Sequence, residues 1–246
     1  MSGPRNLGYP YPYALAVCFL LLSSSARTAP AAKEHPGDVF TAEQILERVA
    51  KTYAHCKTYL DAGVVETTYI RSLSRQLESK PFMTAFVRPD RFRFEYKARS
   101  YSTNKVETSH IVWRDKKNWV AEPEDSKKDP FMMALAGATG VSGGSAHTVP
   151  ALLLPDEVAG RRITEMTEPE RLKDETLGKA RCFRIRGLHG GQPATVWIDK
   201  RFFLLRRIDQ DHDYKDFRTE TRTLYQPILD KKIKPEFLEF KPPKKD

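Results

Sequence analysis

The stretch "RPDRFRFEYKARS", Arg88 to Ser100, decides the fold, because its side chains change character at every second residue. Successive side chains of a β-strand point to opposite faces, so the aromatic residues of this stretch share one face and the charged residues share the other. The aromatic residues are Phe92, Phe94 and Tyr96, and the charged residues are Arg91, Arg93, Glu95 and Lys97. A base-stacking platform needs rings and basic groups on one accessible surface. The pattern predicts a half-buried strand and no nucleic-acid partner.

The same period of two recurs along the chain in short runs rich in β-branched and aromatic residues. These runs cover residues 64–70, 82–87, 91–97, 110–113, 118–122, 202–210 and 217–225, and two hairpins turn at residues 115–117 and 189–192. Turn residues separate the runs, which is typical of an antiparallel meander. The sequence therefore predicts a mainly β (α+β) chain with a single sheet.

Two segments depart from the strand pattern. Thr41 fits a helix N-cap with Gln44 three residues later, and Ile45, Val49 and Tyr53 form an apolar stripe, so a helix that packs onto the sheet begins here. Residues 129–158 hold a Met-rich apolar segment, a Gly- and Ser-rich loop and the apolar run "ALLLP". This segment is a flap that moves over a cavity or a cover that stays in place.

The N-terminus has the pattern of an export signal. The apolar run "ALAVCFLLL", Ala14 to Leu22, follows Arg5 and precedes small residues, so we expect a cleaved signal peptide over residues 1–31, cut after Ala26 or Ala31. Residues 32–40 then form a linker, 41–243 the folded domain and 244–246 a basic tail. Export predicts a periplasmic location, and the net charge of +9 describes a basic surface.

Two cysteines remain after removal of the signal, Cys56 and Cys182. In an oxidising compartment two such residues are expected to pair, so we predict a disulfide, with two buried free thiols as the alternative.

Two motifs resemble catalytic or metal sites. "GVSGG" has the outline of a nucleophile elbow around Ser142, but it lies in a Gly-rich loop of a β sequence, so serine hydrolysis is the less favoured alternative. Asp209, Asp211, Asp213 and Glu220 have the spacing of a calcium loop, and an acidic strand edge explains that spacing equally well. The histidines show no zinc-binding spacing, and we predict no metal, no cofactor and no enzymatic activity.

Several motifs, taken in order, resemble the LolA/LolB-like superfamily of outer-membrane lipoprotein-sorting proteins, in its divergent DUF2092-like branch. They are "AHCKTYLDAGVV", "FVRPDRFRFEY", "IVWRDKKNWV", "CFRIRG", "VWIDKRFFLLRRI" and "YQPILDKKIKPEFLEFKPP". The resemblance implies an unclosed half-barrel, made of one curved antiparallel sheet, with an N-terminal helix and a short helical lid. Its concave face would hold lipid or acyl chains. In the characterised chaperone an arginine holds the lid shut, and the sequence leaves open which arginine would do so here.

Aromatic residues at alternate strand positions, together with the apolar lid, are the expected lining of this hydrophobic-ligand site. The residues are Phe86, Phe92, Phe94, Tyr96, Trp113, Trp119 and Trp197 from the sheet, and Met132, Met133, Leu135, Leu152, Leu153 and Leu154 from the lid. The predicted function is a monomeric periplasmic carrier of a lipid or an acylated lipoprotein. The alternative is a sensor like the RseB family, which binds a lipidic signal and a membrane-bound partner protein.

Overall fold

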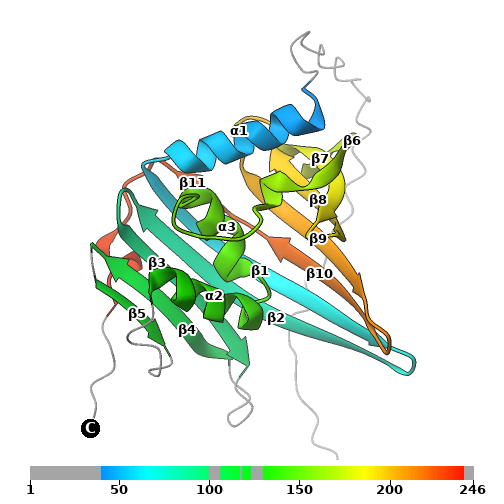
Figure 1. The fold of residues 1–246 in the computed structure, drawn as a ribbon, viewed down its shortest axis with the longest axis horizontal. Coiled ribbons are helices and arrows are strands. Elements are labelled where there is room, and N and C mark those ends of the chain that lie inside the picture. Colours follow the sequence, from blue (N-terminus) through cyan, green and yellow to red (C-terminus); the bar gives the residue numbers. More distant parts are fainter. Residues whose placement is uncertain (1–39, 100–105, 117, 123–129, 241–246) are drawn as a thin grey trace, which may run out of the picture. The chain divides into compact units, whose positions relative to one another are not determined.

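Alternating apolar and polar residues build one antiparallel sheet in the computed structural model, which describes residues 40–99, 106–116, 118–122 and 130–240. Eleven strands take part, ten of them in the order β5-β4-β3-β2-β1-β10-β9-β8-β7-β6, while β11 pairs with β1. β5 and β6 lie at the two ends of this order, so the sheet is open, as Figure 1 shows. The predicted unclosed half-barrel is therefore confirmed.

The strands follow the sequence pattern closely. Their bounds are β1 Thr58–Arg71, β2 Ser74–Val87, β3 Arg91–Arg99, β4 Val106–Asp115, β5 Asn118–Glu122, β6 Thr167–Leu177, β7 Ala180–His189, β8 Gln192–Asp199, β9 Leu205–Asp213, β10 Arg218–Leu224 and β11 Ile228–Leu229. The sequence missed β6 because this edge strand, "TEPERLKDETL", is strongly charged and has no apolar alternation. Charge on an edge strand prevents pairing with other chains. The same charge removes the apolar alternation by which a strand is predicted from sequence.

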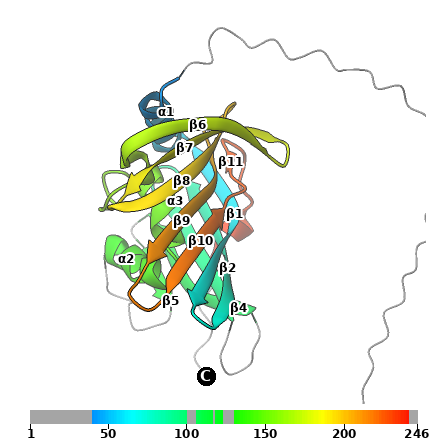
Figure 2. The same ribbon diagram turned by 90° about the vertical axis from the view of Figure 1, so that its right-hand side faces the viewer.

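Three α-helices cover one face of the sheet, here called the inner face. They are α1 Ala42–His55, α2 Phe131–Val141 and α3 Ser145–Leu153. Helix α1 begins as predicted, with Thr41 and Gln44 forming a capping box and with Ile45, Val49 and Tyr53 buried. Figures 1 and 2 place all three helices on the same side of the sheet. No helix among the described residues is both long enough and apolar enough to cross a membrane.

The other, outer face of the sheet carries a short cover from the C-terminal part of the chain. Residues 230–240, which include the 3₁₀ helix η3 Pro235–Phe237, follow β11 and are called the strap below. Asp230 accepts hydrogen bonds from the backbone N–H groups of Lys57 (2.6 Å) and Thr58 (3.3 Å), which fixes the start of the strap beside β1. In Figure 2 the strap and the helices lie on opposite sides of the strands.

Close packing on the inner face requires glycine at two places. A Cβ atom on Gly63 of β1 would lie 2.3 Å from the ring of Phe82, so only glycine lets this ring lie across the strand. In the turn between α2 and α3, Gly143 has a φ of +66° and its Cα faces Val65 of β1. The turn between the two lid helices is thus seated directly on the sheet.

Candidate functional site: the clamped helical lid

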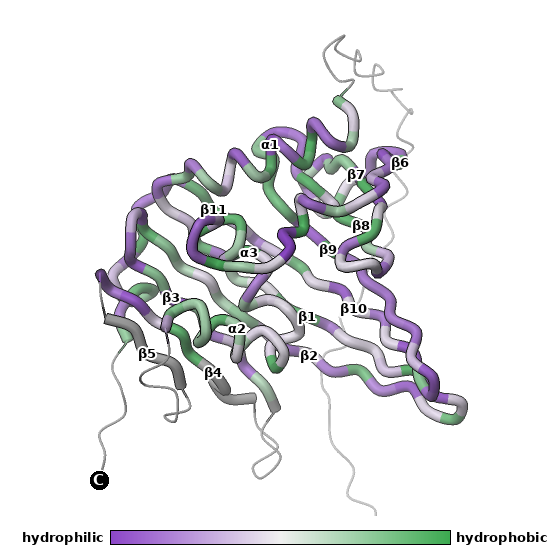
Figure 3. The backbone as a smooth tube through the Cα atoms, in the orientation of Figure 1, coloured by the Kyte–Doolittle hydropathy of each residue, from purple (hydrophilic) through white to green (hydrophobic). Residues whose placement is uncertain are grey.

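Helices α2 and α3 form a lid over the inner face, here defined as residues 131–154. The sequence "FMMALAGATGVSGGSAHTVPALLL" of this lid contains no Asp, Glu, Lys or Arg. Figure 3 shows the lid in neutral to hydrophobic colours, in contrast to the hydrophilic far end of β9 and β10. The expected Gly- and Ser-rich loop is wrong in part, because α2 continues to Val141 and only the glycine turn before α3 is non-helical.

Aromatic rings from neighbouring strands lie under the lid. Phe86 and Phe92 are paired residues of β2 and β3 and are fully buried, as is Phe94. The ring of Phe131, the first residue of α2, meets that of Phe92 edge-on at a centroid distance of 5.1 Å. Such contacts add to the hydrophobic stabilisation of the lid.

Arg88 joins the sheet to the ends of two helices. Its Nε donates to the carbonyl of Cys56 (3.0 Å), and its Nη2 donates to the carbonyls of Leu153 (2.9 Å) and Tyr53 (3.3 Å). The last carbonyls of a helix have no partner within the helix and carry partial negative charge. One guanidinium therefore caps both α1 and α3 and fixes the end of the lid against the turn between β2 and β3.

Arg114 of β4 holds both ends of the lid from the other rim. Its guanidinium lies 4.1 Å from the ring centre of Phe131, at the start of α2, and pairs with Glu157, just after α3. Its Nε also donates to the carbonyl of Asp90 (3.2 Å). The side chain of Arg114 is 9% exposed and that of Glu157 is 47% exposed, so the carboxylate is the end of the pair that water reaches.

Most of the predicted lining residues lie together in the core between the sheet and the lid. These are Phe86, Phe92, Phe94, Tyr96, Leu135, Leu152, Leu153 and Leu154, all buried. Met132 and Met133 do not join them: they are 40% and 53% exposed and point away from the sheet. The inward stripe of α2 is Phe131, Ala134, Leu135 and Ala138, at helical spacing, which places both methionines on the opposite side.

The prediction that tryptophans share the inner face is wrong for the two whose side chains are described. Trp113 pairs with Arg93 and Trp197 with Arg184 and Arg207, which places both indoles on the outer face. Trp113 donates from Nε1 to the carbonyl of Leu238 in the strap (2.6 Å). The side chain of Trp119 lies outside the described part of the chain. The strand register, and not the hydrophobicity of the indoles, determines the face to which these tryptophans point.

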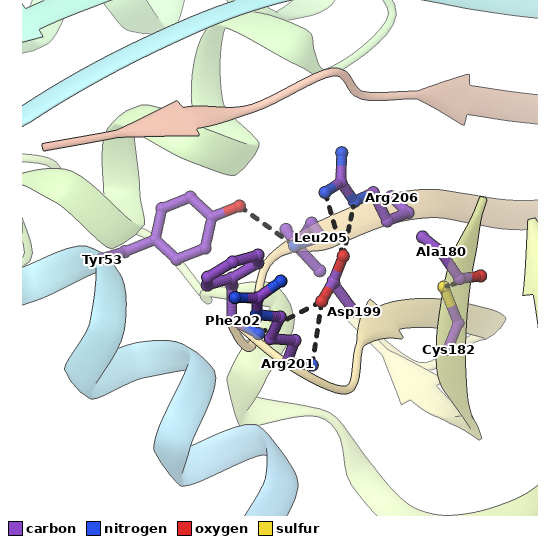
Figure 4. Close-up of polar contacts among 8 residues, drawn as sticks. All are labelled: Tyr53, Ala180, Cys182, Asp199, Arg201, Phe202, Leu205 and Arg206. Carbon is purple, nitrogen blue, oxygen red and sulfur yellow. Dashed lines mark hydrogen bonds and ion pairs between the residues drawn. The ribbon is translucent and has the colours of Figure 1, made fainter. Parts of the chain in front are cut away.

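Cys56 and Cys182 are two separate buried thiols, so the predicted disulfide is wrong. Cys56 ends α1 on the inner side, whereas Cys182 alternates with the inward Phe183 on β7 and points to the outer face. The sheet therefore lies between them, and Figure 4 shows Cys182 beside Ala180, away from α1. Burial raises the pKa of each thiol to about 11, so both stay protonated at neutral pH.

The motif around Ser142 connects the two lid helices. Its hydroxyl donates to the carbonyl of Thr139 (3.3 Å) and accepts from the N–H of Ala146 (3.1 Å), and the side chain is buried. Nearby, His147 contacts the carbonyl of Ala159 through Nε2 (3.0 Å). The two hydrogen bonds of Ser142 satisfy backbone groups at the end of α2 and at the start of α3, as those of a capping residue do.

The carboxylates with calcium-like spacing are paired with arginines instead. Asp209 pairs with Arg207 and Arg222, Asp211 and Asp213 pair with Arg218, and Glu220 pairs with Arg75 and Arg218. Among the described residues no group of three or more His, Cys, Asp or Glu could hold a metal ion. The aspartates share one face of β9, as residues two apart do, but β9 pairs with both β8 and β10 and is not a sheet edge.

One buried carboxylate on the inner face, Asp61 of β1, was not predicted from the sequence. Its oxygens accept from the N–H of Gln226 (2.7 Å) and the hydroxyl of Tyr59 (3.1 Å). Burial raises the pKa of Asp61 from 3.8 to about 6, and these two hydrogen bonds and Arg206 oppose that rise. The hydroxyl of neighbouring Tyr53 accepts from the N–H of Leu205 (3.1 Å), which ties α1 to β9, as Figure 4 shows.

Several solved structures have a similar fold. No family model matches the chain, and no curated protein matches it. The fold is similar to LprF from Mycobacterium bovis, with a TM-score of 0.44, 13% identity and coverage of 75% of this chain and 91% of LprF. It is similar to MucB, with a TM-score of 0.45, 11% identity and coverage of 81% of this chain and 62% of MucB.

A third similar structure is the LolA superfamily protein NE2245 from Nitrosomonas europaea, with a TM-score of 0.28, 8% identity and coverage of 82% of this chain and 98% of that protein. MucB has also been solved in complex with MucA. At these identities the likeness concerns the fold alone.

Proposed function

We propose that the protein is an exported, periplasmic, non-enzymatic carrier that holds a lipid or an acyl chain of a lipoprotein between the sheet and the lid. The observation that carries this proposal is the lid itself. An uncharged cover lies on a face of aromatic rings and is fixed at its rims by Arg88 and Arg114. A buried CH₂ group contributes about 0.8 kcal/mol, so an acyl chain can replace the apolar contacts that the lid loses as it lifts.

A groove of about 450 Å³ supports the same proposal. It lies between α1 and the segment after α3, and Leu46, Leu152 and Met166 are among its apolar lining residues. Leu152 belongs to the lid, so the groove reaches the lid edge. We propose it as the entry for the acyl chain, with Phe86, Phe92, Phe94 and Tyr96 as the face on which the chain settles and Leu135 and Leu152–Leu154 as its cover.

The test combines lipid analysis with a matched pair of variants. Native mass spectrometry of the mature chain, followed by lipid extraction, should find a co-purified lipid, and a fluorescent fatty acid should bind. Glu157→Gln weakens the Arg114 clamp without disturbing the core, so a larger fraction of molecules has an open lid. Since the apparent Kd falls as the competent fraction rises, we expect about three- to tenfold tighter binding.

Glu220→Gln is the matched control, because Glu220 is a half-exposed carboxylate that pairs with Arg75 and Arg218 on the outer face of β10, away from the lid and its groove. Protein that repeatedly purifies without lipid and takes up no fatty acid would contradict the carrier function. The sensor alternative stays a prediction: an envelope pull-down that recovers a membrane regulator and no lipoprotein would favour it. A serine-reactive probe that labels the wild type but not Ser142→Ala would contradict the non-enzymatic role.

A further inference from the structure

A second apolar site lies on the outer face, opposite the lid. A groove of about 600 Å³ opens over β1, β2 and β3 beside the strap. Its apolar lining is Leu60, Ala62, Val64, Pro81, Met83, Leu224, Ile228 and Phe237. Pockets that bind small ligands measure about 300–1,000 Å³, so the groove has the size of a binding site.

The groove lies on the same face as a charged region. At the far ends of β2, β9 and β10 this region carries the pairs of Arg75 with Glu220 and Arg218 with Asp211. At the groove, by contrast, Ala62 is exposed at the floor and Ile228 is 49% exposed. A concave apolar surface left in water is unfavourable, and such patches mark binding sites.

The wall of the groove is held in place. Arg93 donates from Nη1 to the strap carbonyls of Glu236 (3.2 Å) and Glu239 (2.5 Å), and Trp113 donates to the carbonyl of Leu238 (2.6 Å). These bonds fix Phe237 at the edge of the groove, so the site exists before any ligand binds.

Among the described lining residues of the groove, Lys97 supplies an available positive charge. Glu95 is paired with Arg93, whereas Lys97 is exposed and forms no ion pair or hydrogen bond with any residue in the described part of the chain. A lone ammonium at the mouth of an apolar groove complements an anionic head group on a hydrocarbon chain.

We propose that this groove binds the hydrocarbon chain of a single-chain amphiphile, whose carboxylate or phosphate group pairs with Lys97. The site is separate from the inner face, so it does not depend on lid opening. A fatty acid and a lysophosphatidic acid share this chemistry, and the experiment uses both, each with a dansyl label, together with a neutral dansyl monoacylglycerol.

The first test fills the groove. In the full chain, Ala62→Trp places an indole in the exposed floor without touching the core, and we expect it to weaken binding of the anionic probes about tenfold or more. Thr68→Trp is the matched control, since it lies on the same face of β1 among polar residues, and its affinity should equal that of the wild type. An unchanged Kd for Ala62→Trp would overturn the proposal.

The second test removes the charge. Lys97→Gln should weaken binding of the anionic probes about three- to fivefold at low salt and leave the neutral probe unchanged, since an exposed ion pair contributes up to about 1 kcal/mol. Equal losses for the anionic and the neutral probes would overturn the role of Lys97. A stronger effect on the fatty acid than on the phosphate probe would identify the carboxylate as the preferred head group.

The third test separates this site from the lid site. A photoreactive fatty acid should label peptides that contain Leu60–Val64 and Pro81–Met83. Label found only in Phe131–Leu154 would overturn the outer site and support the carrier function, whereas label only on the outer face would do the reverse. Uptake that begins only after deletion of residues 241–246 would also overturn the proposal, because the groove would then belong to the chain's own C-terminus.

Discussion

Two arginines five residues apart hold the covers of opposite faces of the sheet. Arg88 donates to the carbonyl of Leu153 and fixes the helical lid on the inner face, while Arg93 donates to the carbonyls of Glu236 and Glu239 and fixes the strap on the outer face. The chemistry is the same in both cases, a guanidinium bound to backbone carbonyls. The result differs, because the lid is packed against aromatic rings and the strap leaves a groove of about 600 Å³.

The difference shows that the side chains under a cover decide whether a site is closed or open. Under the lid, the ring of Phe92 meets that of Phe131 at the start of α2, and Phe94 is fully buried. Under the strap, Ala62 and Val64 are too small to fill the space up to Phe237. An inner ligand must therefore displace protein contacts, whereas an outer ligand enters an existing groove.

The largest expected effect comes from removing a ring on each side. Phe92→Ala should lower the free energy of unfolding by about 3–5 kcal/mol, because it leaves a cavity in a closed core. Phe237→Ala, the matched control at the partly exposed wall of the groove, should cost about 1 kcal/mol. Urea denaturation followed by circular dichroism measures both, and equal losses would contradict the contrast between a packed and an open cover.

The inner face is not wholly apolar, and Asp61 gives it a pH dependence. Its folded pKa is about 6 against an ordinary value of 3.8, so the folded state prefers the protonated form. The contribution to stability is complete below pH ~4 and is lost as the pH rises through about 6, where a buried charge must form. At roughly 1.4 kcal/mol per pKa unit, the loss is about 3 kcal/mol.

Asp61→Asn isolates this effect, because the amide keeps an acceptor for Gln226 and cannot ionise. The stability of the variant relative to the wild type should rise by about 2 kcal/mol between pH 4.5 and pH 7.5. Other carboxylates titrate in both proteins, so their effects cancel in the difference. Parallel stability curves over this range would show that Asp61 does not titrate as the structure implies.

Most of the sheet could be predicted from the sequence, because residues such as Phe92 and Arg93 report their faces through simple alternation. The same rule failed for Trp113 and Trp197, since the face of a residue depends on strand register and not on its hydrophobicity. The outer groove was missed for a related reason: "YLDAGVV" reads as an ordinary strand, and only pairing brings Ala62 beside Met83.

The bonds of Arg88 to the lid and of Arg93 to the strap could not be predicted either, because each bond joins residues far apart in the chain. Arg88 and Leu153 are 65 positions apart, and Arg93 and Glu236 are 143 apart. Their partners are backbone carbonyls, which leave no mark on the sequence. The predicted disulfide was wrong for a different reason. The composition suggested that Cys56 and Cys182 pair, but they lie on opposite faces of the sheet.

The smallest expected effect compares the two arginines themselves. Arg88→Ala removes the hydrogen bonds to the carbonyls of Cys56, Tyr53 and Leu153 and should cost about 2 kcal/mol, with faster hydrogen exchange at the end of α3. Arg93→Ala frees the strap and also leaves the largely buried Glu95 without its partner, so it should cost about 2 kcal/mol, with proteolysis within residues 230–240. The lid and strap are separate covers, so each variant should change exchange only on its own face. Faster exchange of α3 in Arg93→Ala would show instead that the two faces are coupled through β3.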